Sequence, residues 1–170
     1  MNGFGDFSAR TGHTIILGWQ PVRTRRLVTL LMADRPDDER ILLVDKSLEQ
    51  NPAPDQLDYV RADGLSAPAA LQRAGIMGAS RLIIRGADDD ETLAATLAAS
   101  ATGTTAHIVA HFEDARAAEL IAKQCPNVEA IGSLSAEILV RASRDPGASQ
   151  LADRLLSAES DDTAFSITLP

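Results

Sequence analysis

The sequence predicts an α/β domain of the Rossmann-like class: a doubly wound, mostly parallel six-stranded sheet with a C-terminal helix and edge-strand appendage. The first observation is the apolar run Ile15-Ile16-Leu17, which is too continuous for a strand with one face in water. Such runs are typical of strands covered on both faces, as in parallel sheets. The second is that Gly18 ends this run and a helical pattern follows from Val22 to Met32. The third is that this strand, turn and helix unit repeats along the chain, which favours parallel strands joined by helices.

Most later elements carry the same signals, with apolar runs in strands and apolar stretches behind polar caps in helices, although the third strand is shorter and less apolar. The predicted strands after the first are Ile41–Asp45, Leu57–Ala62, Arg81–Arg85, Thr105–His111 and Val128–Ile131. The predicted helices after the first run from Ala67 to Ala74, from the acidic residues at Asp88 to about Ala101, from Asp114 through Lys123, and from Ser133 to about Ser143. Between the second and third strands, Asn51-Pro-Ala-Pro-Asp55 interrupts any helix, so we expect a short or distorted crossover there.

The chain divides into three parts by composition. Residues 1–12 are rich in Gly, Ser, Asn and Asp and indicate a linker that arrives from something upstream, whereas residues 13–145 carry the repeated units. Asp145-Pro146-Gly147 is the clearest boundary, because proline and glycine together stop the preceding helix. In the extension 146–170 we expect a helix with leucines on one face and an alternating edge strand. This extension cannot form a core alone, so it must pack on the main domain or on another chain, and the second arrangement suggests an oligomer.

Composition excludes several classes of protein. The 170-residue chain has a formal net charge of -8 and scattered basic residues, which argues against nucleic acid as a partner. Cys125 is the only cysteine, and the sequence shows neither a secretory signal nor a long apolar run. We therefore expect no disulfide framework and a reducing, cytosolic setting. No Tyr-x-x-x-Lys pattern, serine elbow or metal-binding histidine pair indicates an enzyme.

The turn after the first strand is a candidate nucleotide site, formed by Gly18, Trp19 and Gln20, with Asp45 at the end of the second strand. In nucleotide-binding versions of this fold an acid at that strand end receives the ribose hydroxyls. However, Gln20 and Arg23 stand where a Gly-x-Gly-x-x-Gly cradle has its later glycines, so their side chains would crowd a dinucleotide. A strand-ending Asp is also a common turn cap, which leaves both interpretations of Asp45 open.

The acidic run Asp88-Asp89-Asp90-Glu91 lies where the fourth strand gives way to its helix. Acids at a helix N-terminus cap free amides and favour the helix dipole, which accounts for one or two of them. Four in sequence exceed what a cap requires. Hard cations such as Ca²⁺ take several carboxylate oxygens, and Asp63 ends the neighbouring third strand at the same edge of the predicted sheet. A divalent-cation site is therefore the alternative to simple capping.

Several stretches carry a resemblance to a known family. They are His13-Thr-Ile-Ile-Leu-Gly-Trp19, Val60-Arg-Ala-Asp63, Ala79-Ser-Arg-Leu-Ile-Ile84, and Ser143-Arg-Asp-Pro-Gly147 followed by Gln150-Leu151. With them the chain resembles the regulator of K⁺ conductance (RCK) domain, also called the TrkA N-terminal domain. The last stretch makes it most similar in look to the CASTOR/POLLUX-type ion channels.

The resemblance implies a cytosolic gating domain on the cytoplasmic face of a membrane. Copies would form dimers within a tetrameric or octameric ring beneath a cation pore carried by the same polypeptide. Ligand binding would shift the ring and open or close the pore. In calcium-gated relatives an acid ending the third strand and acids in the next loop supply metal ligands, and Asp63, Asp89 and Glu91 match that arrangement. NAD or an adenine nucleotide at the turn after the first strand ranks second as a ligand, behind Ca²⁺ or another divalent cation. A regulatory nucleotide-binding subunit of a cation transporter or antiporter is the alternative function.

Overall fold

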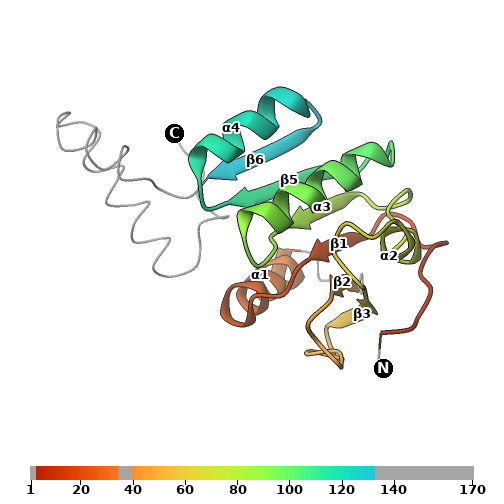
Figure 1. Ribbon diagram of the computed structural model, residues 1–170. Helices are drawn as coiled ribbons and strands as arrows, with labels where there is room; N and C mark the ends of the chain where they lie inside the picture. Colours follow the sequence, from red (N-terminus) through yellow and green to blue (C-terminus); the bar gives the residue numbers. More distant parts are fainter. Residues whose placement is uncertain (1–2, 35–39, 133–170) are drawn as a thin grey trace.

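The computed structural model describes residues 3–34 and 40–132, and within them the chain folds around one sheet of six parallel strands (Figure 1). The strands lie in the order β3-β2-β1-β4-β5-β6. Their bounds are β1 (Thr14–Leu17), β2 (Ile41–Asp45), β3 (Leu57–Arg61), β4 (Arg81–Ile84), β5 (His107–Phe112) and β6 (Val128–Gly132). All six predicted strands are confirmed. The predicted helix from Ser133 and the extension 146–170 lie outside the described residues.

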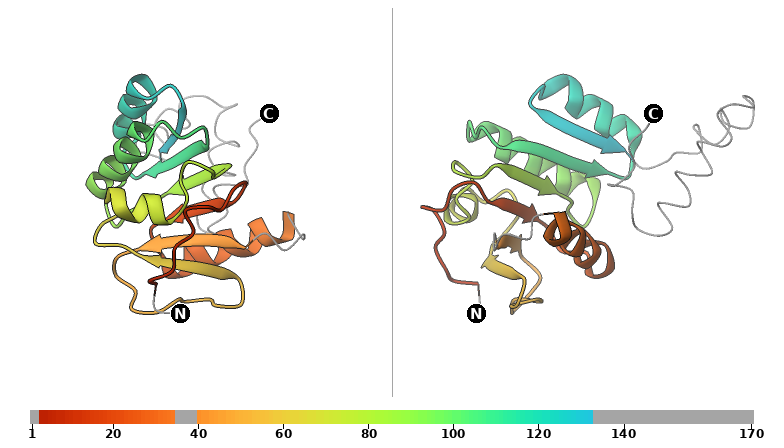
Figure 2. Two further views of the ribbon diagram at one scale, coloured as in Figure 1. Left: turned by 90° about the vertical axis from the view of Figure 1, so that its right-hand side faces the viewer. Right: turned by 180° about the vertical axis from the view of Figure 1, so that it is seen from behind.

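Four helices connect the described strands and cover both faces of the sheet. They are α1 (Pro21–Asp34), α2 (Pro68–Arg73), α3 (Asp89–Ala101) and α4 (Ala115–Gln124). Seen with the sheet turned, α2, α3 and α4 lie on one face and α1 on the other (Figure 2). This division follows from the right-handedness of parallel crossovers. The chain passes from β1 to β2 and β3 in one direction and then returns past β1 to β4, which changes the covered face.

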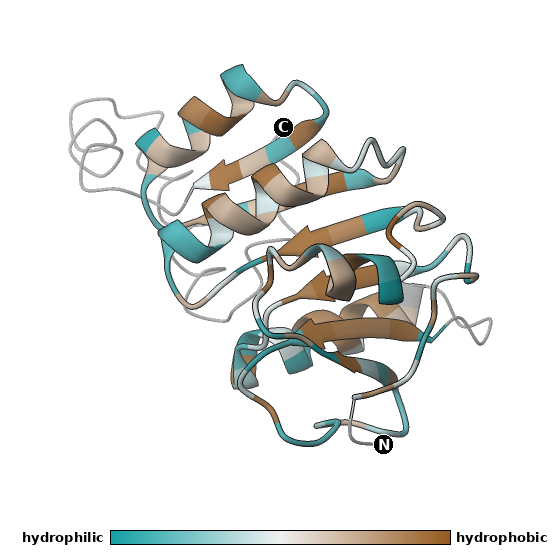
Figure 3. Cartoon of the chain, turned by 45° about the vertical axis from the view of Figure 1, so that its right-hand side comes forward, coloured by the Kyte–Doolittle hydropathy of each residue, from teal (hydrophilic) through white to brown (hydrophobic). Residues whose placement is uncertain are grey.

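The core is split by the sheet into two clusters of buried side chains. The larger cluster joins alternate residues of the central strands, such as Leu17, Ile84 and Ile108, to the small residues of α2, α3 and α4. The smaller cluster places Ile16 and Tyr59 against Val28 of α1. The apolar strands therefore run through the middle of the domain while polar residues gather in loops and at helix ends (Figure 3).

Strand register brings the functional loops to one level. Leu17 of β1 pairs with Val44 of β2 and with Ile84 of β4. The residues that follow these three paired positions therefore lie at the same edge of the sheet; they are Gly18, Asp45 and Arg85. This is the carboxyl edge, where loops of parallel α/β sheets carry ligand sites.

The crossover from β2 to β3 contains no helix, as the sequence predicts. Asn51 organises it: its side-chain NH₂ donates to the carbonyl of Leu57 at 2.6 Å, and its side-chain oxygen accepts from the N–H of Ala53 at 3.0 Å. Pro52 and Pro54 have no N–H to continue a helical ladder.

The N-terminal segment, predicted as a linker, packs on the domain. Phe4 forms an antiparallel bridge with Val60, and the Arg73 guanidinium donates to the carbonyl oxygens of Gly3 and Gly5 at 2.6 to 3.3 Å. Residues 3–12 thus lie along β3 and α2, while a connection to an upstream part stays a prediction. None of the helices in the described residues is long and apolar enough to cross a bilayer.

Candidate functional site

The candidate site lies at the carboxyl ends of β1 and β4, where the strand order changes direction. The loop after β1 leads to α1 on one face, and the loop after β4 leads to α3 on the other. Such a switch point leaves a crevice between the diverging loops, which is where open α/β sheets bind ligands. A cavity of about 80 Å³ lies there. Its lining is polar and comprises Gln20, Arg85, Gly86, Ala87, Asp88, Asp89, Thr92, His111 and Glu113.

Gly18 is required by the packing of the sheet. Its φ is +102°, in the region that favours glycine, and a Cβ there would lie 2.0 Å from the carbonyl oxygen of Arg85. Its N–H donates to the carbonyl of Val44 at 2.9 Å. The turn between β1 and α1 is therefore pressed against β4, and the need for glycine arises within the protein, whether or not a ligand approaches.

Asp45 acts as the cap of two turns. One carboxylate oxygen accepts from the N–H of Trp19 at 3.0 Å, and the other accepts from the N–H and the hydroxyl of Ser47 at 2.8 and 2.6 Å. Asp45 is 5% exposed, so these donors hold it inside the edge of the sheet. Of the two interpretations of Asp45, the capping role is the one its contacts display.

Tyr59 lies below the same strand end. Its hydroxyl donates to the carbonyl of Leu48 at 2.7 Å and lies 3.2 Å from the carbonyl of Asp45. Burial raises the pKa of Tyr59 to about 12, and the negative charge of Asp45 adds to that rise. The phenol is therefore a neutral donor that fixes the loop after β2.

The helix N-terminus that would face a pyrophosphate is already partly occupied. The N–H of Gln20 donates to the hydroxyl of Thr24 at 2.8 Å, and α1 begins at Pro21, which has no N–H. The ring of Trp19 packs on the smaller core cluster, with the Arg25 guanidinium 5.4 Å from the ring centre. The turn of Gly18, Trp19 and Gln20 is thus closed by internal bonds.

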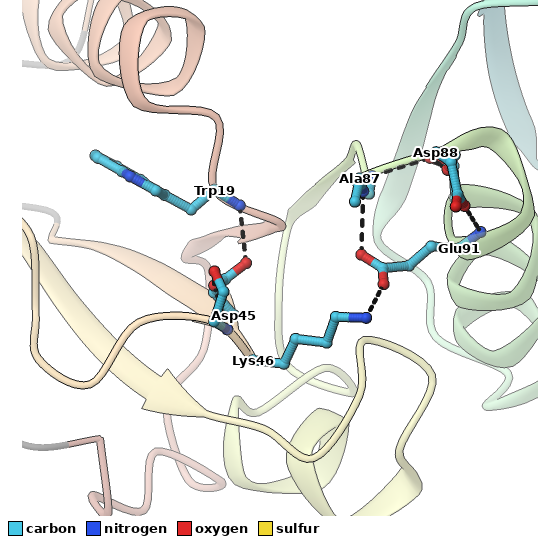
Figure 4. A network of polar contacts seen from close by, with 9 residues as sticks. Trp19, Asp45, Lys46, Ala87, Asp88 and Glu91 are labelled. Atoms are coloured by element: carbon cyan, nitrogen blue, oxygen red, sulfur yellow. Dashed lines mark hydrogen bonds and ion pairs between the residues drawn. The ribbon is translucent and has the colours of Figure 1, made fainter.

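The acids at the start of α3 have different environments, and Figure 4 shows those of Asp88 and Glu91. Asp88 is the N-cap, and its carboxylate accepts from the N–H of Glu91 at 2.8 Å. The two carboxylate oxygens of Asp89 accept from the backbone N–H groups of Glu113 and Asp114 at 2.8 and 3.0 Å. Asp90 is exposed. The capping interpretation therefore accounts for Asp88, while Asp89 ties α3 to the loop after β5.

Glu91 links the loop after β4 to the loop after β2. One carboxylate oxygen accepts from the N–H of Ala87 at 3.1 Å, and the other forms an ion pair with the ammonium of Lys46, the residue after β2 (Figure 4). The pair raises the pKa of Lys46, because the Glu91 carboxylate bonds and attracts the charged ammonium. Lys46 was not among the site residues predicted from the sequence. The one sequence feature that pointed to it was its position directly after a strand-ending acid.

The residues predicted to bind a metal are not gathered by the fold. Asp63 lines a separate cavity of about 410 Å³ beside the end of β3, together with Phe4, Arg61 and Arg73. Asp89 and Glu91 use their carboxylates in the bonds described above. Within residues 3–34 and 40–132, no group of three or more His, Cys, Asp or Glu side chains is placed to hold a metal ion. A site formed by Asp63, Asp89 and Glu91 stays a prediction.

Arg85 lines the crevice, Lys46 directly follows β2, and Arg23 lies in the first turn of α1; each of these cations contacts an acid. Lys46 pairs with Glu91, the Arg85 guanidinium lies 2.7 Å from the Glu113 carboxylate, and that of Arg23 lies 3.9 Å from it. His111 faces the same region at 5% exposure. Burial lowers the pKa of His111, against the opposing effects of Glu113 and Asp89, so the imidazole is held toward its neutral form.

A nucleotide can be tested against this geometry. Sites for small molecules have volumes of about 300–1,000 Å³, whereas the crevice holds about 80 Å³. The amides and the carboxylate that would contact pyrophosphate and ribose are already bonded to Thr24, Trp19 and Ser47. In the conformation described, the crevice therefore does not fit a whole nucleotide.

Comparison with known proteins identifies the fold and the family. The structure is similar to the GsuK RCK domain, with a TM-score of 0.62 and 17% identity over 77% of this chain and 28% of that one. It is similar to the GsuK channel bound to NAD, with a TM-score of 0.63 and 16% identity over 77% of this chain and 23% of that one. It is also similar to the Kef CTD of Shewanella denitrificans in its AMP-bound form, with a TM-score of 0.55 and 19% identity over 91% of this chain and 90% of that one.

These likenesses establish the fold, and this chain spans about a quarter of the length of those two GsuK chains. No protein of curated function is similar enough in sequence to match. The particular likeness to CASTOR/POLLUX-type channels stays a prediction. The family follows from the sequence itself, which matches the TrkA-N domain over residues 14–133. Because that match includes all six strands of the sheet, the chain belongs to the TrkA-N domain family.

Proposed function

We propose that this chain is a ligand-sensing regulatory domain of a potassium or other cation channel, or of a cation transporter, and that it acts by binding and not by catalysis. The observation that carries the proposal is the TrkA-N match over residues 14–133, which includes both loops of the crevice. A ligand controls such a domain only if it binds one conformation better than another. The loops after β1 and β4 lead to opposite faces of the sheet, so a ligand between them can act on both.

The proposal includes partners. One of the similar structures is named as a channel, which favours a domain that works beside a membrane pore of the same polypeptide. The Kef CTD matches over nearly its whole length, which favours the alternative of a regulatory unit of a transporter. In either case we propose a homo-oligomer on the cytoplasmic face of the membrane. Light scattering of the 170-residue chain at high micromolar concentration should then give a dimer or larger, and a monomer would count against this part.

The proposed ligand is an adenosine 5′-phosphate. NAD and AMP, the ligands named for the GsuK channel and the Kef CTD, share that group. Because the crevice is too small for a nucleotide in the conformation described, the proposal requires the loops around it to separate. The ligand would then favour the open form, as a regulatory ligand must.

Ca²⁺ at Asp63, Asp89 and Glu91 is the competing ligand. It would have to break the bonds from Asp89 to two backbone amides and the ion pair from Glu91 to Lys46. It would also have to bring Asp63 across from the cavity beside β3. The nucleotide requires fewer of these rearrangements, so we place it first.

Titration calorimetry of the 170-residue chain with AMP, NAD and Ca²⁺ tests the proposal. AMP and NAD are expected to give saturable heats. Asp89→Ala and its exposed neighbour Asp90→Ala serve as a pair matched in charge. Calcium heat that is lost in Asp89→Ala and kept in Asp90→Ala would replace the nucleotide with a cation. The absence of heat with all three ligands would overturn the proposal.

A further inference from the structure

The ion pair between Lys46 and Glu91 spans the end of the central strand. Lys46 follows β2 and Glu91 lies in the first turn of α3, which follows β4. Strands β2 and β4 flank β1 in the sheet, so the pair reaches from one side of β1 to the other. In the close view the Lys46 side chain extends from the end of β2 toward the Glu91 carboxylate (Figure 4). The contact therefore bridges the end of β1, beside the crevice in which the ligand is proposed to bind.

The two partners differ in how firmly they are held. Glu91 is anchored on its own side by the N–H of Ala87, and its side chain is 18% exposed. The absence of a side chain at Gly86 lets Glu91 lie close, since a Cβ there would be 2.8 Å from the Cβ and Cγ of Glu91. The Lys46 side chain is 45% exposed and ends in a flexible stem. Lys46 is therefore the partner that can move.

The charge around the crevice opposes an anion while the pair is closed. Carboxylates of Asp45, Asp88, Asp89 and Glu113 border the same loops. The Arg85 side chain is 18% exposed and bonded to Glu113, so it is less available than Lys46 to a ligand. A phosphate at this edge of the sheet needs a cation, and Lys46 is an exposed cation whose carboxylate partner is held on the other side of β1 by the N–H of Ala87.

We propose that Lys46 is the phosphate-binding residue of the crevice and that Glu91 holds it in a closed latch, so that ligand phosphate and the Glu91 carboxylate compete for one ammonium. The inference rests on the proposed function, because it concerns the same crevice. Phosphate binding exchanges one partner of Lys46 for another.

The latch makes the two partners respond in opposite directions. Glu91→Gln removes the competitor and one negative charge but keeps an oxygen for the N–H of Ala87, so AMP should bind roughly two- to fivefold tighter, the range expected for an exposed ion pair. Lys46→Gln removes the cation, so AMP should bind about tenfold more weakly, as for a charge-assisted hydrogen bond at a partly exposed site. In the double variant the benefit of Glu91→Gln should vanish, because it acts through Lys46.

The test is a double-mutant cycle by titration calorimetry with AMP, and with adenosine as the ligand that lacks phosphate. Glu129→Gln, an acid paired with His107 on β5, and Lys123→Gln in the last turn of α4 are the matched charge controls. Neither should change the Kd of AMP. Circular dichroism and urea midpoints check that all variants are folded. The adenosine Kd should be equal in all four proteins of the cycle, which a general loosening of the crevice would not produce.

The outcomes separate the latch from the proposed function. Tighter AMP binding in Glu91→Gln that disappears in the double variant supports the latch. If the unmodified chain binds AMP but Glu91→Gln binds it no more tightly, or Lys46→Gln binds it equally well, the latch is wrong and the proposed function stands. If none of the four proteins binds AMP, the proposed function fails and the latch with it.

Discussion

Asp45 offers a sharp test of whether the acid at the end of β2 serves the fold or a ligand. Its carboxylate accepts the N–H of Trp19, the N–H of Ser47 and the hydroxyl of Ser47 at 2.6 to 3.0 Å, and it is 5% exposed. Asp45→Ala leaves two backbone donors without their acceptor. We therefore expect a loss of stability in the absence of any ligand.

The size of the loss follows from those bonds. A hydrogen bond to a charged group contributes about 1.5–3 kcal/mol. Ser47 is exposed, so its hydroxyl can hydrogen-bond to water in the variant and its bond is not counted. The bonds of the two amides are counted at about 1.5 kcal/mol each, the low end of the range, because they lie near the edge of the sheet. The expected loss is about 3 kcal/mol, which lowers Tm by about 6–12 °C in a chain of this size.

Urea unfolding followed by circular dichroism measures this loss, with Asp55→Ala as the control because Asp55 is an exposed acid in the loop before β3. Asp55→Ala should leave the urea midpoint unchanged. The reasoning is refuted if Asp45→Ala unfolds at the same urea midpoint as the unmodified chain. An unchanged midpoint with weaker AMP binding would instead make Asp45 a ligand-binding residue.

Three further predictions follow from the same edge of the sheet. Gly18→Ala should destabilise the fold by more than about 3 kcal/mol or abolish soluble expression, because its Cβ would lie 2.0 Å from the carbonyl oxygen of Arg85, the residue after β4. By contrast, a Cβ at Gly64 would meet nothing within 4 Å, so Gly64→Ala should be tolerated. Asp89→Ala should speed amide exchange in the loop after β5, which would remain protected if the two bonds to that loop were unimportant. Burial lowers the pKa of His111 below its ordinary value of 6.5, so the unfolded chain binds the imidazole proton more tightly than the folded chain does. The free energy of unfolding should therefore fall as the pH drops below about 6.5. His111→Gln should reduce that fall, and the same pH profile in both proteins would contradict the prediction.

The fold could be predicted because its signals are local. The central strands contain continuous apolar runs such as Ile15-Ile16-Leu17, and burial of both faces in a parallel sheet explains such runs. The break between β2 and β3 was visible in Pro52 and Pro54, which act through their own backbone. Element boundaries then followed within a residue or two, as at β3, predicted to end at Ala62 and observed to end at Arg61.

The N-terminal segment shows what local signals miss. Its glycines and polar residues are typical of a linker, yet Arg73 binds the carbonyls of Gly3 and Gly5 from about 70 residues away in sequence. Every residue type has the same backbone carbonyl, so the sequence of residues 3–12 contains no signal that predicts this contact. A docked segment and a free linker can have the same composition.

The site could be located but not assembled from the sequence. The switch point follows from the strand order. The sequence also placed four candidate residues at the carboxyl edge of the sheet, where the structure has them: Gly18, Asp45, Asp89 and Glu91. Their bonds were not predictable, because each depends on a partner from a distant loop. The ion pair from Glu91 to Lys46 joins residues 45 positions apart, and it depends on the crossing geometry of β2 and α3.

The account depends on the crevice at the ends of β1 and β4 being where ligand binds, and an NMR titration of the ¹⁵N-labelled 170-residue chain with AMP tests this most directly. Trp19 is the only tryptophan, so its indole N–H gives one signal in the turn after β1. We predict saturable shifts in that signal and in the amides of residues 18–20 and 86–91. Shifts confined to the residues around the 410 Å³ cavity beside β3, or no shifts at all, would contradict the account.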